Sequence, residues 1–146
     1  MKYDDASWHY GGDFPQDLPD EAGATHIALF AAWAALHDLA GDIHTVDCQA
    51  DLECLRRREL TPRNWFISVC DGKLTDQDLN ERGNAFAEAY YGIEGELRTE
   101  TGSYLADYDH VFADAPSFYH VPDGWLAFDA LGPTIDRRFA SWTAAN

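Results

Sequence analysis

The segment that most constrains the fold is "DEAGATHIALFAAWAALHDLAGD", residues 20–42, which is apolar on almost every side of a helix. At helical spacing, His26, Phe30 and Trp33 share one face, while Ile27 and several alanines make the remaining faces apolar. A helix of this kind is typical of the centre of a domain, because no polar side is left to face water. We therefore expect the other elements to pack around it.

The rest of the chain also has helical patterns. Thr61 followed by Pro62 predicts an N-cap and a first helical residue, and Thr75 predicts a second N-cap. Gly83 costs about 1 kcal/mol relative to alanine within a helix, which indicates close approach of another element. Apolar spacing predicts further helices over 47–60, 61–72, 75–92, 101–116 and 123–142.

These patterns predict an all-α fold: a single compact domain, 1–146, with five or six helices around a buried central helix. Residues 117–122 are expected to form an extended connector, and Gly132-Pro133 to kink or break the last helix. Residues 1–20 contain two prolines and a glycine pair, so we expect an irregular N-terminal arm packed on the core.

Charge limits the kinds of partner. The chain has 26 acidic and 10 basic residues and a formal net charge of −16. Such a surface repels nucleic acid and anionic lipid, so we expect neither as a partner. It attracts a basic protein and speeds the encounter, although acidity can also serve solubility alone.

Cysteine usage and hydropathy predict a cytoplasmic protein. The chain has three cysteines, Cys48, Cys54 and Cys70. This odd number and the lack of a CxxC spacing favour reduced thiols. The first residues lack the apolar core of a secretory signal. The longest apolar run, Ile27–Leu36, is about half of a membrane span.

The opening stretch "YDDASWHYGGDFP" combines rings, acids and a histidine. We expect Trp8 and Phe14 to bury against the core, contributing about 2 kcal/mol each, and to hold the arm in place. Asp4 and Asp5 would then cap turns or pair with arginines. An aromatic site for a cationic or sugar ligand is the alternative interpretation.

Four stretches, "YDDASWHYGGDFP", "DEAGATHIALFAAWA", "LTDQDLNERGNAFAEAYY" and "PTIDRRFASW", resemble a family of uncharacterised bacterial domains. The resemblance covers nearly the whole chain. It implies a small bacterial, cytosolic, single-domain protein, and it brings no activity, substrate or site residues.

Catalytic motifs are absent from the sequence, so we expect no cofactor and favour a protein that is not an enzyme. The alternative is a metal-dependent enzyme or ligand-binding protein that uses His9, His26 and His120. If the arm folds over the start of the central helix, these imidazoles with Asp4 or Asp5 would suit zinc.

The leading functional hypothesis is an acidic interaction domain, monomeric or homodimeric, that binds a basic protein. Its sharper form is an immunity or antitoxin-like protein that neutralises a toxin by charge complementarity. An architectural domain without activity is the third hypothesis. Acids beside aromatic residues are the predicted contact residues: Glu88, Tyr90, Tyr91, Asp107, Tyr108 and Asp109.

Overall fold

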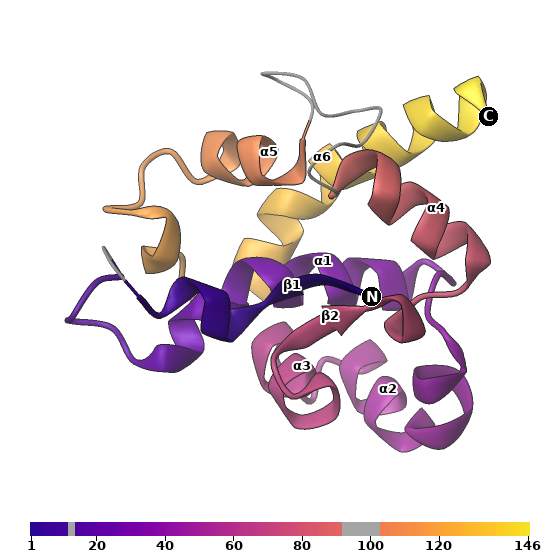
Figure 1. Cartoon of the computed structure of the whole chain (residues 1–146), viewed down its shortest axis with the longest axis horizontal. Helices are drawn as coiled ribbons and strands as arrows, with labels where there is room; N and C mark the ends of the chain where they lie inside the picture. The colour runs from indigo at the N-terminus through magenta and orange to yellow at the C-terminus, as the bar shows by residue number, and fades with distance from the viewer. Residues whose placement is uncertain (12–13, 92–102) are drawn as a thin grey trace.

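The computed structural model describes residues 1–11, 14–91 and 103–146. The chain is mostly helical, with a small two-stranded sheet (Figure 1). Its α-helices are α1 (Thr25–Leu36), α2 (Gln49–Arg56), α3 (Pro62–Cys70), α4 (Glu81–Tyr90), α5 (Tyr104–Val111) and α6 (Trp125–Ala145). The strands are β1 (Lys2–Asp5) and β2 (Lys73–Thr75). Short helical turns are η1 (Ala6–His9), η2 (Asp20–Ala24), η3 (Ile43–Asp47), η4 (Asp76–Asp78) and η5 (Phe118–His120).

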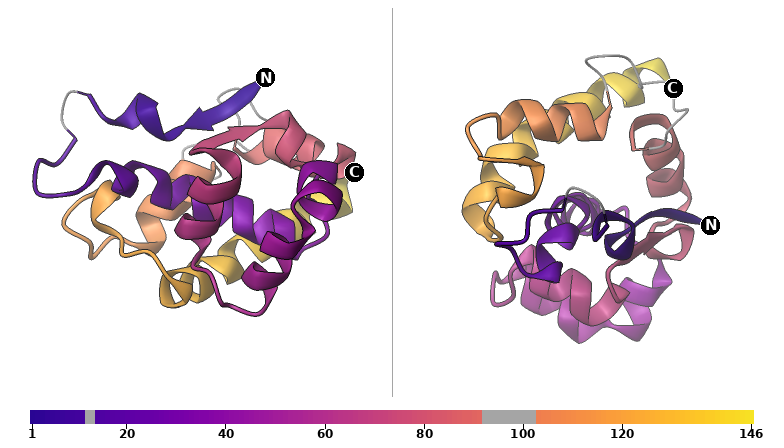
Figure 2. Two further views of the ribbon diagram at one scale, coloured as in Figure 1. Left: turned by 90° about the horizontal axis from the view of Figure 1, so that it is seen from below. Right: turned by 60° about the vertical axis from the view of Figure 1, so that its left-hand side comes forward.

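Helix α1 is buried over almost its whole length. Every residue from Thr25 to Ala35 is buried, in line with the apolar character of all its faces. Figures 1 and 2 show α2 and α3 on one side of α1 and α5 and α6 on the other. None of the helices in the described residues is long and apolar enough to cross a membrane.

Local capping signals place several helix starts. The Thr61 side chain accepts from the Asn64 amide, and Pro62 occupies the first turn of α3, as predicted. Thr75 caps the short turn η4 and not α4, which begins later with Asn80 as its N-cap. The predicted start of the fifth helix at Thr101 lies outside the described residues, and α5 begins after Ser103.

Gly83 in α4 and Pro133 in α6 are both singled out by the sequence as positions that affect a helix. A Cβ on Gly83 would lie 2.5 Å from the Leu39 carbonyl oxygen, so the predicted close approach is confirmed. In α6 the predicted break does not occur, since the helix runs continuously through Pro133. A kink at Gly132-Pro133 stays a prediction. The predicted extended connector at 117–122 contains the single 3₁₀ turn η5.

The N-terminal segment contains a strand that the sequence did not predict. β1 pairs antiparallel with β2, with Asp4 opposite Leu74 and Asp5 opposite Lys73, and with an irregularity between Lys2 and Asp4. Asp5 then caps η1 by accepting from the Ser7 amide, which agrees with the capping role expected of it. Backbone pairing therefore holds the start of this segment.

The expected anchoring by aromatic rings is partly wrong. Trp8 is 58% exposed, so it does not pack into the core. Phe14 is half-buried and contacts the rings of Tyr10 and Tyr119, at centroid distances of 6.0 and 5.0 Å. Strand pairing and the buried side chain of Asp4 replace the predicted role of Trp8.

Candidate metal site at Asp4, His9 and His26

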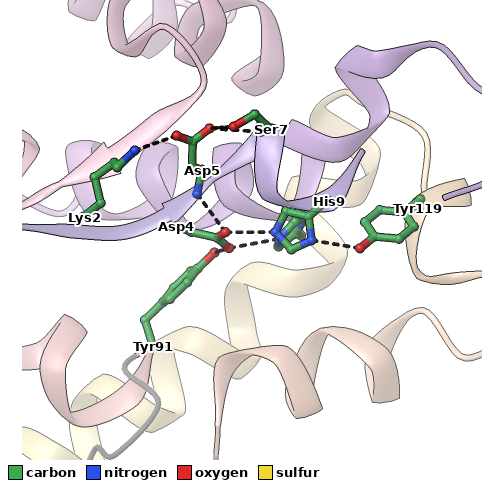
Figure 3. Close-up of polar contacts among 8 residues, drawn as sticks. Lys2, Asp4, Asp5, Ser7, His9, Tyr91 and Tyr119 are labelled. Atoms are coloured by element: carbon green, nitrogen blue, oxygen red, sulfur yellow. Dashed lines mark hydrogen bonds and ion pairs between the residues drawn. The ribbon is translucent and has the colours of Figure 1, made fainter. Parts of the chain in front are cut away.

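The buried carboxylate of Asp4 is the centre of a polar cluster (Figure 3). Its Oδ1 lies 2.8 Å from His9 Nε2 and accepts from the Asp5 amide at 2.8 Å. Its Oδ2 lies 3.1 Å from His26 Nε2 and accepts from the Tyr91 hydroxyl. Four groups from three parts of the chain thus converge on one side chain.

Three elements bring the two imidazoles to Asp4. The turn η1 directly follows β1 and folds His9 back over Asp4, while His26 lies in the first turn of α1. The two rings meet edge to face, with centroids 4.6 Å apart. Phe118, which belongs to η5 together with Tyr119, packs against His26 with ring centroids 4.8 Å apart. The cluster therefore ties the N-terminal segment to α1.

Burial and hydrogen bonding set the protonation states. Burial alone would raise the pKa of Asp4, but the hydrogen bonds from His26 and His9 outweigh it and hold this pKa well below its usual range. Burial lowers the pKa of His26, against the opposing effect of Asp4. The metal-free site therefore contains an ionised carboxylate beside a neutral His26 at neutral pH.

The same geometry forms a hydrogen-bonded chain from Tyr119 to Asp4. The Tyr119 hydroxyl lies 2.8 Å from His9 Nδ1. An ionised carboxylate only accepts, so Nε2 of His9 donates to Asp4. In the tautomer that carries its proton on Nε2, Nδ1 accepts from the Tyr119 hydroxyl. Burial, with a smaller effect of Asp4, raises the pKa of Tyr119, which keeps its hydroxyl protonated. Chemically, the chain can pass a proton between the half-buried Tyr119 and His9.

Asp4, His9 and His26 also offer one ligand atom each to a metal ion. The three atoms, one carboxylate oxygen and two Nε2 atoms, all lie within 4.8 Å of one another. Two imidazoles and one carboxylate form the ligand set of many catalytic zinc sites, which leaves one coordination position open. A bound ion would take the place of the two Nε2 protons that now point at Asp4, and each neutral ring would then carry its proton on Nδ1.

Comparison with known proteins gives a family and no activity. The chain matches the family described as "Domain of unknown function (DUF7832)" over residues 2–121. It belongs to this family. No curated protein and no solved structure gives a match. The DUF7832 region includes Asp4, His9, His26, Tyr91 and Tyr119, so the whole cluster lies within the family's domain.

His120, the third histidine of the predicted metal set, lies elsewhere in the DUF7832 domain. Its Nε2 lies 2.9 Å from Asp17 Oδ2 and its Nδ1 lies 2.6 Å from the Ser117 hydroxyl. The structure thus brings His9 and His26 together but not His120, because the neighbouring Tyr119 side chain is the one that reaches His9. Asp4, which the sequence suggested only as an accompanying carboxylate, is the shared partner.

The predicted contact residues for a basic partner are mostly internal, so the structure corrects this set. Tyr90 donates to Asp107 Oδ2 at 2.7 Å, and Arg138 binds both oxygens of the same carboxylate. Tyr91 donates to Asp4, as described above. The buried members are Tyr90, Tyr91, Asp107 and Tyr108, and the exposed members are Glu88 and Asp109. A partner can therefore reach only the two acids of this set.

Sequence reasoning missed Tyr91 and Tyr119 as parts of the site. Tyr91 ends α4, and Tyr119 lies in η5, far along the chain from Asp4. Both residues lie among other aromatic residues that form the core, so no local signal distinguishes their hydroxyl groups. Only the tertiary packing brings them to the cluster.

Proposed function

We propose that this DUF7832 domain binds one divalent transition-metal ion, with zinc as the reference ion, at Asp4, His9 and His26. The observation that carries the proposal is the convergence of two imidazole Nε2 atoms on one buried, ionised carboxylate. Ionised carboxylate and neutral imidazole are the forms that bind a metal, and Asp4 is already ionised at neutral pH.

Partners around the ligands support this proposal. Metal-binding side chains usually have a second hydrogen-bond partner that fixes their orientation. The Tyr119 hydroxyl faces the other nitrogen of His9, and the Tyr91 hydroxyl donates to Asp4. Within the described residues, His26 Nδ1 has no hydrogen-bond partner, and the ring is held by packing against Phe118 and Tyr108.

The ion would connect the N-terminal segment to the body of the domain. Asp4 and His9 belong to β1 and η1, whereas His26 belongs to α1. A ligand that binds only the folded state adds to its stability, by about 2.7 kcal/mol when its concentration is 100 times the dissociation constant. Metal binding would therefore order the surface formed by residues 1–10, including the exposed Trp8.

The test uses protein without an affinity tag. After treatment with a chelator, we expect zinc to raise the melting temperature and one ion per site to be retained after gel filtration, measured by mass spectrometry of the metal. His9→Asn should abolish both the rise in melting temperature and the retained ion. His120→Asn is the matched control, because both histidines are about one-fifth exposed and each faces one carboxylate and one hydroxyl group. Equal metal binding by wild type and His9→Asn would refute the proposal.

A second candidate function is the binding of a basic protein through the N-terminal surface. A cavity of about 360 Å³ is lined by Tyr10, by Lys73 and by four acids from three elements or turns: Asp5, Asp20, Glu21 and Asp71. Tyr10, which lines the cavity, is exposed, and so is Trp8, two residues before it in the chain. Exposed Trp and Tyr residues are the preferred anchors of protein interfaces, and surrounding acids favour a basic partner. This surface replaces the largely buried set predicted from sequence, and a toxin is the sharper form of the partner.

Affinity capture from a bacterial lysate tests this second candidate. We expect a basic protein to be retained at low salt, lost at high salt and lost from Trp8→Ala. Leu126→Ala is the control, because Leu126 is also an exposed large side chain but lies on α6. If the same amount of the protein is retained at high salt and by Trp8→Ala, this surface is not the binding site.

A further inference from the structure

A second cluster of ligand-type side chains is formed by three residues that do not belong to the first. His44 is in η3, Cys70 ends α3 and Asp78 ends η4. His44 and Asp78 are buried, and Cys70 is partly buried. The three residues have no role in the Asp4 site, and their elements adjoin one another only in the folded chain.

The distances among the three ligand atoms are those of a metal-binding tripod. His44 Nε2 lies 2.9 Å from Asp78 Oδ1, Cys70 Sγ lies 3.5 Å from the same oxygen, and Sγ and Nε2 are 3.7 Å apart. Around tetrahedral zinc, bonds of about 2.0 Å to nitrogen and oxygen and 2.3 Å to sulfur place ligand atoms roughly 3.3–3.6 Å apart. Little movement would be needed to accept an ion.

The carboxylate of Asp78 is held in position for this role. Its Oδ2 accepts from the Thr75 amide at 2.8 Å and from the Thr75 hydroxyl at 3.2 Å. The other oxygen, Oδ1, is thereby directed at His44 and Cys70. Metal ligands are commonly oriented by such outer hydrogen bonds.

The imidazole of His44 is also held by packing. Its ring lies 5.1 Å from the Trp65 ring, and its Nδ1 is buried without a hydrogen-bond partner among the described residues. All of the polar contacts of this ring are therefore made by Nε2, the atom that faces both Asp78 and Cys70.

We infer that His44, Cys70 and Asp78 bind a zinc ion that joins η3, the end of α3 and η4. The Cys70 thiol loses its proton to solvent as the Zn–S bond forms, and the His44 ring carries its proton on Nδ1 once Nε2 binds the ion. No electron transfer is involved. The thiolate and the Asp78 carboxylate then balance the charge of the ion, and solvent water fills the fourth position. This site is independent of the ion proposed at Asp4, since the two sites share no residue.

Cobalt(II) distinguishes the two sites, because only this one contains a thiolate. We expect a sulfur-to-cobalt charge-transfer band in the near ultraviolet when cobalt is added to chelator-treated protein, and zinc should displace it. The double variant Cys48→Ser/Cys54→Ser should keep the band, since Cys70 is then the only thiol. His9→Asn should also keep it, even if the ion at Asp4 is lost.

Cys70→Ser should lose the charge-transfer band and one bound ion, with Cys54→Ser as the matched control that loses neither. If Cys70→Ser does not fold, the double variant still decides the matter, because its cobalt spectrum reports Cys70 alone. Absence of the band from both wild type and the double variant would overturn the inference. A band that persists in folded Cys70→Ser would overturn it as well.

Discussion

Asp4→Asn tests how strongly the buried carboxylate stabilises the fold. In the metal-free protein Asp4 accepts hydrogen bonds from the Asp5 amide, His9, His26 and the Tyr91 hydroxyl. An amide of the same shape keeps one acceptor oxygen and presents an NH₂ group to donors. Two charge-assisted bonds then become neutral ones, at about 1 kcal/mol each, and one buried polar group loses its partner, at about 1–3 kcal/mol. We expect a total loss of about 3–5 kcal/mol.

The assay for this loss is urea unfolding in the presence of a chelator, followed by far-ultraviolet circular dichroism. Asp17→Asn is the matched control, because Asp17 also faces a histidine Nε2, at 2.9 Å, but is 70% exposed. Water can replace the interaction there, so we expect the control to unfold close to wild type. If Asp4→Asn is no less stable than Asp17→Asn, the reasoning about the buried carboxylate is wrong.

Three further outcomes follow from the structure. The folded-state pKa values of Asp4 and His26 both lie below their unfolded values, so the unfolded chain binds more protons. The urea midpoint of metal-free protein should therefore fall as the pH drops from 7 through 6.5 towards 3.8. A urea midpoint that does not change over this pH range would contradict the two pKa shifts. Gly83→Ala should destabilise the fold despite the gain of about 1 kcal/mol in helix propensity, because the new Cβ would lie 2.5 Å from the Leu39 carbonyl oxygen. A melting temperature above that of wild type would contradict this close approach. Trp8→Ala should change the free energy of unfolding by less than about 0.5 kcal/mol, since the side chain is mostly exposed, and a larger loss in urea unfolding would show that Trp8 packs after all.

Local signals in the sequence predict the mostly helical character of the fold and some of its helix boundaries. The apolar faces of residues 25–35 predict burial without knowledge of any partner, and Thr61 with Pro62 predicts the start of α3. The strands β1 and β2 could not be predicted in this way. Each is short, and each depends on a partner about 70 positions away, which the local pattern does not contain.

The candidate site was predictable only in part. The sequence suggested that His9 and His26 approach one another if the N-terminal segment folds over the first helix, and the structure places their rings in contact. It could not exclude His120, because a histidine beside aromatic residues has the same local pattern whichever way its backbone turns. The aromatic residues Tyr90 and Tyr108 illustrate the same ambiguity, since core residues and interface anchors are chemically alike.

The pairing of β1 with β2 has a consequence for the order of assembly during translation. Lys2 pairs with Thr75, and Asp4 also needs Tyr91, so residues 2–5 must wait for the synthesis of residues 73–91 before they find their partners. Contacts between such distant positions slow folding, because a long loop must close before they form. Until then the apolar α1 lacks its covering elements, and the nascent chain offers chaperones a hydrophobic target.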